Sequence, residues 1–150
     1  MNQNVSTRTC KRSNEKGFTL LEIIVAISIL TFGILAVASM QVSSMRGNSF
    51  AGSVTEATAL AGDRLERLIA LSYDDGLLND DNGNGSGGLN DTGDDADYDD
   101  TRVMDPVTYT VCTNLAIDTP RNNTKTIKVI VTWTDRGFQK SVSLQHVKAR

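Results

Sequence analysis

The chain has 150 residues, of which 39% are apolar and 5% aromatic, and its formal net charge is −3. This length accommodates one domain with appendages, and the modest apolar content limits the size of any soluble core. The acidic balance argues against nucleic acid as the main partner.

Charge is distributed unevenly along the chain. Residues 1–17 contain four Lys or Arg and one Glu, whereas residues 74–105 contain eleven Asp and one Arg. The first segment is therefore a basic leader, and the second is an acidic segment that differs in composition from its surroundings.

The chain has two cysteines, Cys10 and Cys112, and their positions argue against an internal disulfide. Cys10 lies in the basic leader, so removal of the leader would leave Cys112 without a partner and exclude an internal disulfide. We interpret Cys112 as a small buried residue in a strand.

An apolar segment runs from Phe18 to Val42, and Glu22 is its only charged residue. As a helix it is about 38 Å long at about 1.5 Å per residue, which is enough to span a bilayer with some tilt. Because the basic cluster precedes it, we expect the N-terminus to stay cytoplasmic and the remainder to be exported.

Two simple interpretations of this segment leave Glu22 unexplained. Residues 36–38 (Ala-Val-Ala) resemble the cleavage site of a secretory signal peptide. The second interpretation is an uncleaved anchor. A charge within hydrocarbon costs about 2.5–3.5 kcal/mol at mid-depth, so an anchor would be more stable without Glu22.

A third interpretation explains every residue. The sequence KGFTLLE at residues 16–22, followed by the apolar run, resembles the class III leader of type IV pilins and type II secretion pseudopilins. The resemblance implies cleavage between Gly17 and Phe18, N-methylation of Phe18, and retention of the apolar segment. Glu22 would then pair with the Phe18 amine of a neighbouring subunit, because an unpaired charge in an apolar filament core is costly.

The helix is predicted to continue from Phe18 to about Ser72. Its second half is amphipathic, with apolar residues at steps of three and four: Phe50, Val54, Ala57, Ala61, Leu65, Leu68 and Leu71. This face should pack on the strands that follow.

The acidic segment contains a candidate calcium loop. Asp80, Asn82 and Asn84 alternate before Gly85, and Asp91 follows after five residues, which matches the ligand spacing of a calcium loop. The alternative is a solvated, disordered acidic loop, since this composition cannot build a core.

Strand patterns follow Pro106. Residues 107–115, 126–133 and 138–147 alternate or are rich in β-branched residues, and the turn at 134–137 joins the last two as a hairpin. We predict an α+β pilin fold in which the helix packs on three or four antiparallel strands, with Trp133 in the core.

The predicted organisation has five parts: a removed cytoplasmic leader (1–17), a transmembrane or filament-core helix (18–45), an amphipathic helix (46–73), the acidic loop (74–105) and a sheet (106–150). The helix tail ATALAGDRLERLIAL and the ending VIVTWTDRGFQKSVSLQHV resemble PilV-type minor pilins, the type IV pilus modification proteins. That resemblance implies a fimbrial subunit with a role in cell adhesion.

The resemblance implies a non-enzymatic minor pilin that is inserted in the inner membrane as a single pass, processed by the prepilin peptidase and methyltransferase, and assembled with other pilins. The C-terminal domain would be periplasmic and later lie at the cell surface. A type II secretion minor pseudopilin and a membrane-anchored calcium-binding adhesin module are the alternatives. An enzyme is disfavoured because His146 is the only histidine and no catalytic set is evident.

Overall fold

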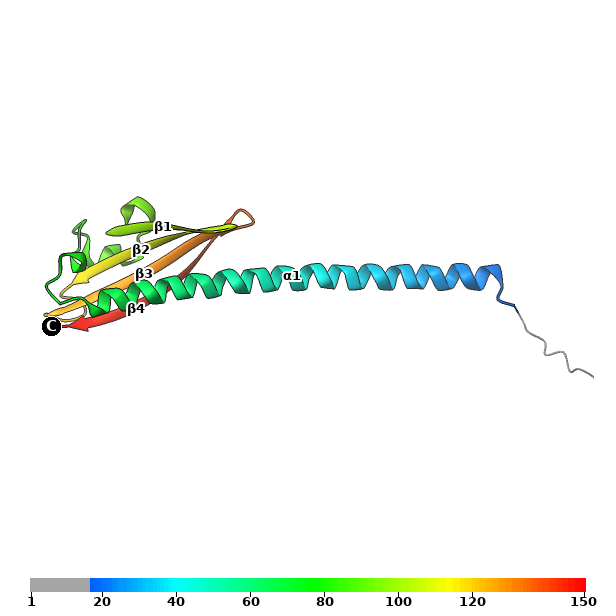
Figure 1. The fold of residues 1–150 in the computed structure, drawn as a ribbon, viewed down its shortest axis with the longest axis horizontal. Helices are drawn as coiled ribbons and strands as arrows, with labels where there is room; N and C mark the ends of the chain where they lie inside the picture. The colour runs from blue at the N-terminus through cyan, green and yellow to red at the C-terminus, as the bar shows by residue number, and fades with distance from the viewer. Residues whose placement is uncertain (1–16) are drawn as a thin grey trace, which may run out of the picture. The chain divides into compact units, whose positions relative to one another are not determined.

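The computed structural model describes residues 17–150, so the basic leader and Cys10 lie outside the described residues. The chain divides into two units, Met1–Ser44 and Met45–Arg150. The helix α1 spans Leu20–Ala70 and contributes to both (Figure 1). The sequence predicted this helix with ends two residues away on each side.

The described part of the first unit exposes its apolar side chains. Every residue from Gly17 to Ser44 is exposed, including Phe18, Leu20 and Phe32, which are 75–79% accessible. Within the described residues, α1 is the one helix long and apolar enough to cross a membrane. This unit therefore has a surface that requires either lipid or other helices to cover it.

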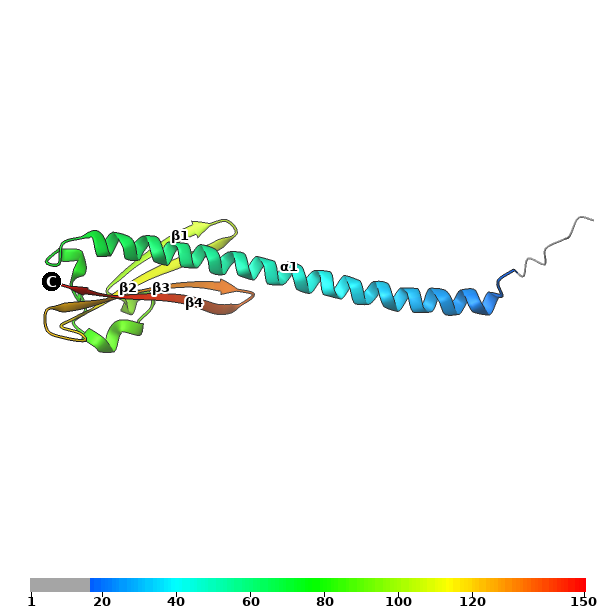
Figure 2. The same cartoon turned by 90° about the horizontal axis from the view of Figure 1, so that it is seen from below.

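The second unit contains a four-stranded antiparallel sheet in the order β1-β2-β3-β4 (Figures 1 and 2). Its strands are β1 (Tyr98–Met104), β2 (Val107–Ile117), β3 (Thr124–Asp135) and β4 (Phe138–Ala149). The three strands expected after Pro106 are present. The sequence did not predict β1, whose residues lie in the segment assigned to the acidic loop.

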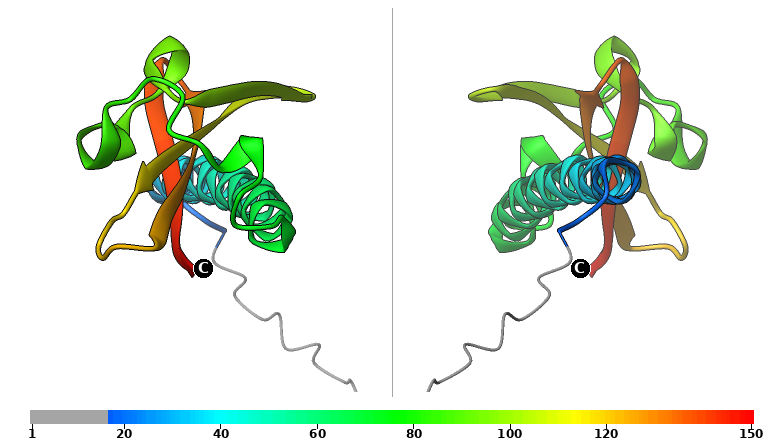
Figure 3. Two further views of the ribbon diagram at one scale, coloured as in Figure 1. Left: turned by 90° about the vertical axis from the view of Figure 1, so that its left-hand side faces the viewer. Right: turned by 90° about the vertical axis from the view of Figure 1, so that its right-hand side faces the viewer.

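The core of the second unit forms where the end of α1 lies on one face of the sheet (Figure 3). The helix contributes Ala57, Ala61 and Leu68, as its apolar periodicity predicted. The sheet contributes the inward residues of β2 and β3: Tyr109, Val111, Leu115, Ile127, Val129, Val131 and Trp133. All of these residues lie in Met45–Arg150, so this unit has a complete core of its own.

The acidic segment is folded in the structure, in contrast to the alternative of a disordered acidic loop. It forms three short 3₁₀ helices, η1 (Gly76–Leu78), η2 (Gly85–Asn90) and η3 (Gly93–Asp95), before it continues into β1. Leu78 is fully buried in the core. Because Leu78 brings an apolar anchor and the polar backbone finds partners on the sheet, the segment does not need a core of its own.

Basic side chains satisfy the end of α1. The ammonium group of Lys148 donates to the backbone carbonyls of Ile69 and Leu71, and buried Lys125 donates to the carbonyl of Leu78 at 2.7 Å. Lys148 complements the negative end of the α1 dipole and satisfies one of its last carbonyls, that of Ile69. Lys125 instead holds the following segment at Leu78.

Candidate functional site

The predicted cleavage point lies immediately before α1. Gly17 and Phe18 are both exposed and lie outside regular structure, and the helix begins at Leu20. A side chain built on Gly17 would meet nothing within 4 Å among the described atoms. A side chain at Gly17 would therefore contact none of the described residues.

Thr19 and Glu22 start the helix. The backbone N–H of Glu22 donates to the hydroxyl oxygen of Thr19 at 3.3 Å, and the N–H of Ile23 donates to the Thr19 carbonyl at 3.2 Å. Thr19 is thus the N-cap, and Glu22 stands at the third helical position of a Thr-x-x-Glu capping pattern. The sequence analysis missed this role, although the spacing was visible in the sequence.

The position of Glu22 is also favourable electrostatically. Its carboxylate is in the first turn of α1, where the positive end of the helix dipole stabilises an acid by about 0.3–1 kcal/mol. One residue can therefore start the helix and present a negative charge close to Phe18.

The four predicted calcium ligands belong to one folded loop. One carboxylate oxygen of Asp80 accepts the Gly85 N–H at 2.8 Å. The Asn84 side-chain amide donates to the Asp91 carboxylate at 2.8 Å, and the Asn84 N–H donates to the Asn82 side chain at 3.2 Å. Hydrogen bonds thus link three of the four residues, Asn82, Asn84 and Asp91, whereas Asp80 is bonded to Gly85 of the same loop.

The fit of this loop to a cation is mixed. The second carboxylate oxygen of Asp80, Oδ1, is enclosed and has no hydrogen-bond partner in the described part of the chain. Within residues 17–150, however, no three His, Cys, Asp or Glu side chains form a metal-binding group. The four side chains offer oxygen atoms of the kind that Ca²⁺ prefers, and two of them, Asp80 and Asp91, are carboxylates.

Asp97, which the sequence analysis did not single out, ties this loop to the sheet. Its buried carboxylate accepts the N–H groups of Asp81 (2.9 Å), Asn82 (3.2 Å) and Leu115 (2.7 Å). The first two donors belong to the loop and the third to β2, so one side chain joins the two.

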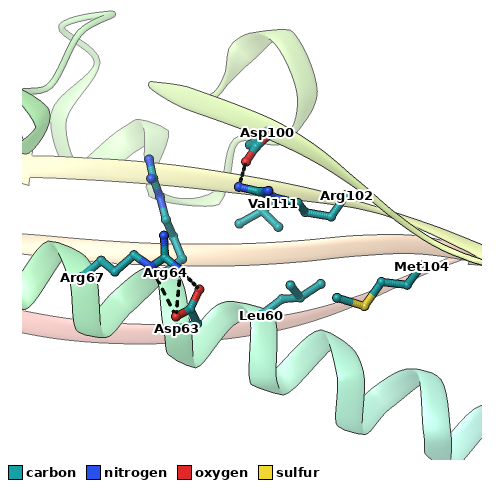
Figure 4. Close-up of a pocket in the computed structure, with 8 residues that line it drawn as sticks. All are labelled: Leu60, Asp63, Arg64, Arg67, Asp100, Arg102, Met104 and Val111. Carbon is teal, nitrogen blue, oxygen red and sulfur yellow. Dashed lines mark hydrogen bonds and ion pairs between the residues drawn. The ribbon is translucent and has the colours of Figure 1, made fainter.

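A cleft of about 230 Å³ lies between α1 and the β1–β2 side of the sheet (Figure 4). Arg67 pairs with Asp63 at 2.9 Å and Arg102 pairs with Asp100 at 2.6 Å. Arg64 donates to the Thr113 hydroxyl at 3.2 Å. The cleft is lined by these charged side chains and by the apolar side chains of Leu60, Met104 and Val111.

The remaining residues considered as functional have structural surroundings. Cys112 is buried, and the N–H of Gly93 donates to its sulfur at 3.3 Å. Burial raises the pKa of the Cys112 thiol, which makes it a poor nucleophile. His146 is half-buried on β4, at one edge of the sheet.

Comparison with known proteins identifies the N-terminal segment. Residues 12–38 match the prokaryotic N-terminal methylation motif, which includes Gly17, Phe18 and Glu22. No curated protein and no solved structure matches the chain. The motif, together with an apolar N-terminal helix packed by its later part on a four-stranded antiparallel sheet, supports a type IV pilin-like or pseudopilin protein.

Proposed function

We propose that the protein is a minor pilin, a non-enzymatic subunit that takes part in the assembly or initiation of a type IV pilus. The observation that carries this proposal is the methylation motif at residues 12–38, placed directly at the start of a helix whose first half is fully exposed. An exposed apolar helix that stays on the mature chain serves first as a membrane anchor and then as a contact surface for other helices.

In this proposal, proteolytic processing of the N-terminus creates the charged group that pairs with Glu22. Cleavage between Gly17 and Phe18 removes the basic leader and creates a new amine, which is then methylated. Phe18 lies four residues before Glu22, just ahead of α1, and both are exposed, so both can face a neighbouring subunit. A correct axial offset then pairs the amine of one subunit with the carboxylate of the next.

The runner-up is a minor pseudopilin of a type II secretion system, which would be processed in the same way. Recovery of the protein in sheared surface pili favours the minor pilin. A requirement for the protein in secretion of exoproteins, without its appearance in pili, favours the pseudopilin.

The direct experiment is the intact mass of the protein from cells with and without prepilin peptidase. We expect a mature chain that begins at Phe18 and carries one methyl group, and a full-length chain when the peptidase is absent. Gly17→Val should retain the leader, because its branched side chain obstructs the backbone at the cleavage point. A mature chain that begins at Ser39 would show instead a secretory signal peptide.

Calcium binding by Asp80, Asn82, Asn84 and Asp91 is the second element of the proposal. The enclosed, unpartnered Oδ1 of Asp80 favours it, since a buried carboxylate oxygen without a partner is unusual. A bound Ca²⁺ would supply a charged partner for this oxygen. Calcium binding is also expected for the alternative, a membrane-anchored calcium-binding adhesin. The processing experiment distinguishes that alternative from a pilin.

A further inference from the structure

The two edges of the sheet carry opposite charge. β1 and β4 are the edge strands. β1 contains Asp99, Asp100 and Arg102, and residues 74–97, which lead into it, contain eight Asp and no Lys or Arg. β4 contains Lys140 and Lys148 and no acid, and because Lys148 donates to the carbonyls of Ile69 and Leu71, Lys140 is the cation of β4 on which the contact depends.

Both edges have backbone groups available for pairing. In the part of the chain that the structure describes, β1 pairs with β2 alone and β4 pairs with β3 alone. Strands alternate in direction across the sheet, so β4 runs antiparallel to β1. A second copy beside β4 can therefore continue the antiparallel alternation with its own β1.

Charge distinguishes between the possible edge-to-edge contacts of two copies. A two-fold contact would place β4 against β4 or β1 against β1, and each of these brings like charges together. A head-to-tail contact brings the basic edge of one copy to the acidic edge of the next, which is complementary. We propose that the β4 edge of one copy pairs antiparallel with the β1 edge of a second copy.

Side-chain rows across the sheet indicate the register. Arg102 of β1 and Lys140 of β4 lie in one row, through Tyr109 and Trp133. A second copy that continued this row without a shift would place its Arg102 beside Lys140. A shift of two residues keeps the same face and places Asp100 there instead.

This register has two further consequences. Arg102 of the second copy comes opposite Phe138, whose ring is 70% exposed and can accept a cation on its face. Thr101 of the second copy comes opposite Gln139. Both Thr101 and Gln139 are exposed, so they can be replaced by cysteine with little effect on the fold.

Disulfide cross-linking tests the contact in the full chain in bacterial membranes. Thr101→Cys and Gln139→Cys are combined in a chain that also carries Cys10→Ser and Cys112→Ala. Within one copy the two positions lie on opposite edges, at least about 14 Å apart because three strand spacings of 4.7–4.9 Å separate β1 from β4. A disulfide needs about 4.4–6.8 Å between Cα atoms. Oxidation should therefore give a ladder of covalent oligomers from the double variant and monomers from each single variant.

Matched variants test register and charge. Thr101→Cys with Ser141→Cys shifts the pair to diagonal positions, about 7–8 Å apart, and should cross-link poorly. Lys140→Glu should reduce the ladder about fivefold, as expected for reversal of a surface ion pair. Asp100→Lys in the same chain should restore it, because each contact then has one of each charge again.

Several outcomes would overturn the proposal. Dimers from either single cysteine variant would show a two-fold contact. Monomers alone from the double variant would show that the charges only protect the edges from pairing. A ladder that Lys140→Glu leaves unchanged would show that charge does not select the contact. The experiment is done in a strain without prepilin peptidase, so its result does not depend on processing or on the proposed function.

Discussion

Asp97 should be the residue on which the folded acidic segment depends most. Its buried carboxylate accepts three backbone N–H groups, at 2.9 and 3.2 Å from the loop and at 2.7 Å from Leu115 in β2. Asp97→Ala removes both acceptor oxygens, and with them all three hydrogen bonds, and leaves no group in their place.

The loss of stability in Asp97→Ala depends on whether the three N–H donors can bond to water instead. A hydrogen bond to a charged acceptor contributes about 1.5–3 kcal/mol. The amides of Asp81 and Asn82 can turn to water when the loop opens, whereas that of Leu115 stays inside β2. We therefore expect the free energy of unfolding to fall by about 2–4 kcal/mol, which lowers Tm by about 10–20 °C for a domain of this size.

Thermal unfolding of the unit Met45–Arg150, followed by circular dichroism, measures this change. Asp94→Ala is the matched control, since it removes the same charge from an exposed side chain of the same segment. Asp97→Asn should give an intermediate loss, because the amide keeps one acceptor oxygen. A Tm for Asp97→Ala equal to that of Asp94→Ala would refute the anchoring role.

Two further predictions concern ionisation and metal. Burial and the hydrogen bond to Glu56 raise the pKa of Tyr109 above its ordinary value of 10.0, so the stability that Tyr109 contributes is full below pH 10 and is lost as pH rises through the folded-state pKa. In urea unfolding between about pH 9 and pH 11.5, the free energy of unfolding should therefore fall less with pH in Tyr109→Phe than in the wild type. An equal fall with pH in the two proteins would contradict this. Ca²⁺ at a hundredfold excess over Kd should stabilise the unit Met45–Arg150 by about 2.7 kcal/mol, and Mg²⁺ should stabilise it less. The double variant Asp80→Ala, Asp91→Ala should show no stabilisation by Ca²⁺. A melting curve that Ca²⁺ does not shift would remove the metal from the proposal.

The helix and three of the strands could be predicted because their signals are local. The apolar run and the later steps of three and four define α1, and the alternation of apolar and polar residues defines β2 and β3. Tyr109, Val111 and Trp133 point into the core as that alternation requires. Periodicity is enough here because each element has one buried face.

The acidic segment could not be predicted in the same way because its order comes from residues far away in sequence. Asp97 bonds to Leu115, and the Asn114 side chain donates to the Asp91 carbonyl at 2.8 Å. β1 was missed because six of its seven residues are exposed, so no buried face marks it as a strand. Composition alone suggested disorder, whereas single anchors such as Leu78 fix the segment.

Glu22 has two physical explanations, and one substitution separates them. The helix-start explanation needs a residue that caps, and Gln serves in a capping box as Glu does. The pairing explanation needs a negative charge near the Phe18 amine of the next subunit. Glu22→Gln keeps the first property and removes the second, whereas Glu22→Ala removes both.

If pairing is the function, Glu22→Gln and Glu22→Ala should both insert in the membrane and both be depleted from sheared pili. Insertion should be slightly easier in each, because a charge that costs up to about 2.5–3.5 kcal/mol in hydrocarbon is gone. Thr19→Val is the complementary control, since it removes the capping hydroxyl that accepts the Glu22 N–H at 3.3 Å and leaves the charge in place; it should enter pili normally. Wild-type recovery of Glu22→Gln in pili, with loss of Thr19→Val, would show that Glu22 is there to start the helix and that the register of subunits is set elsewhere.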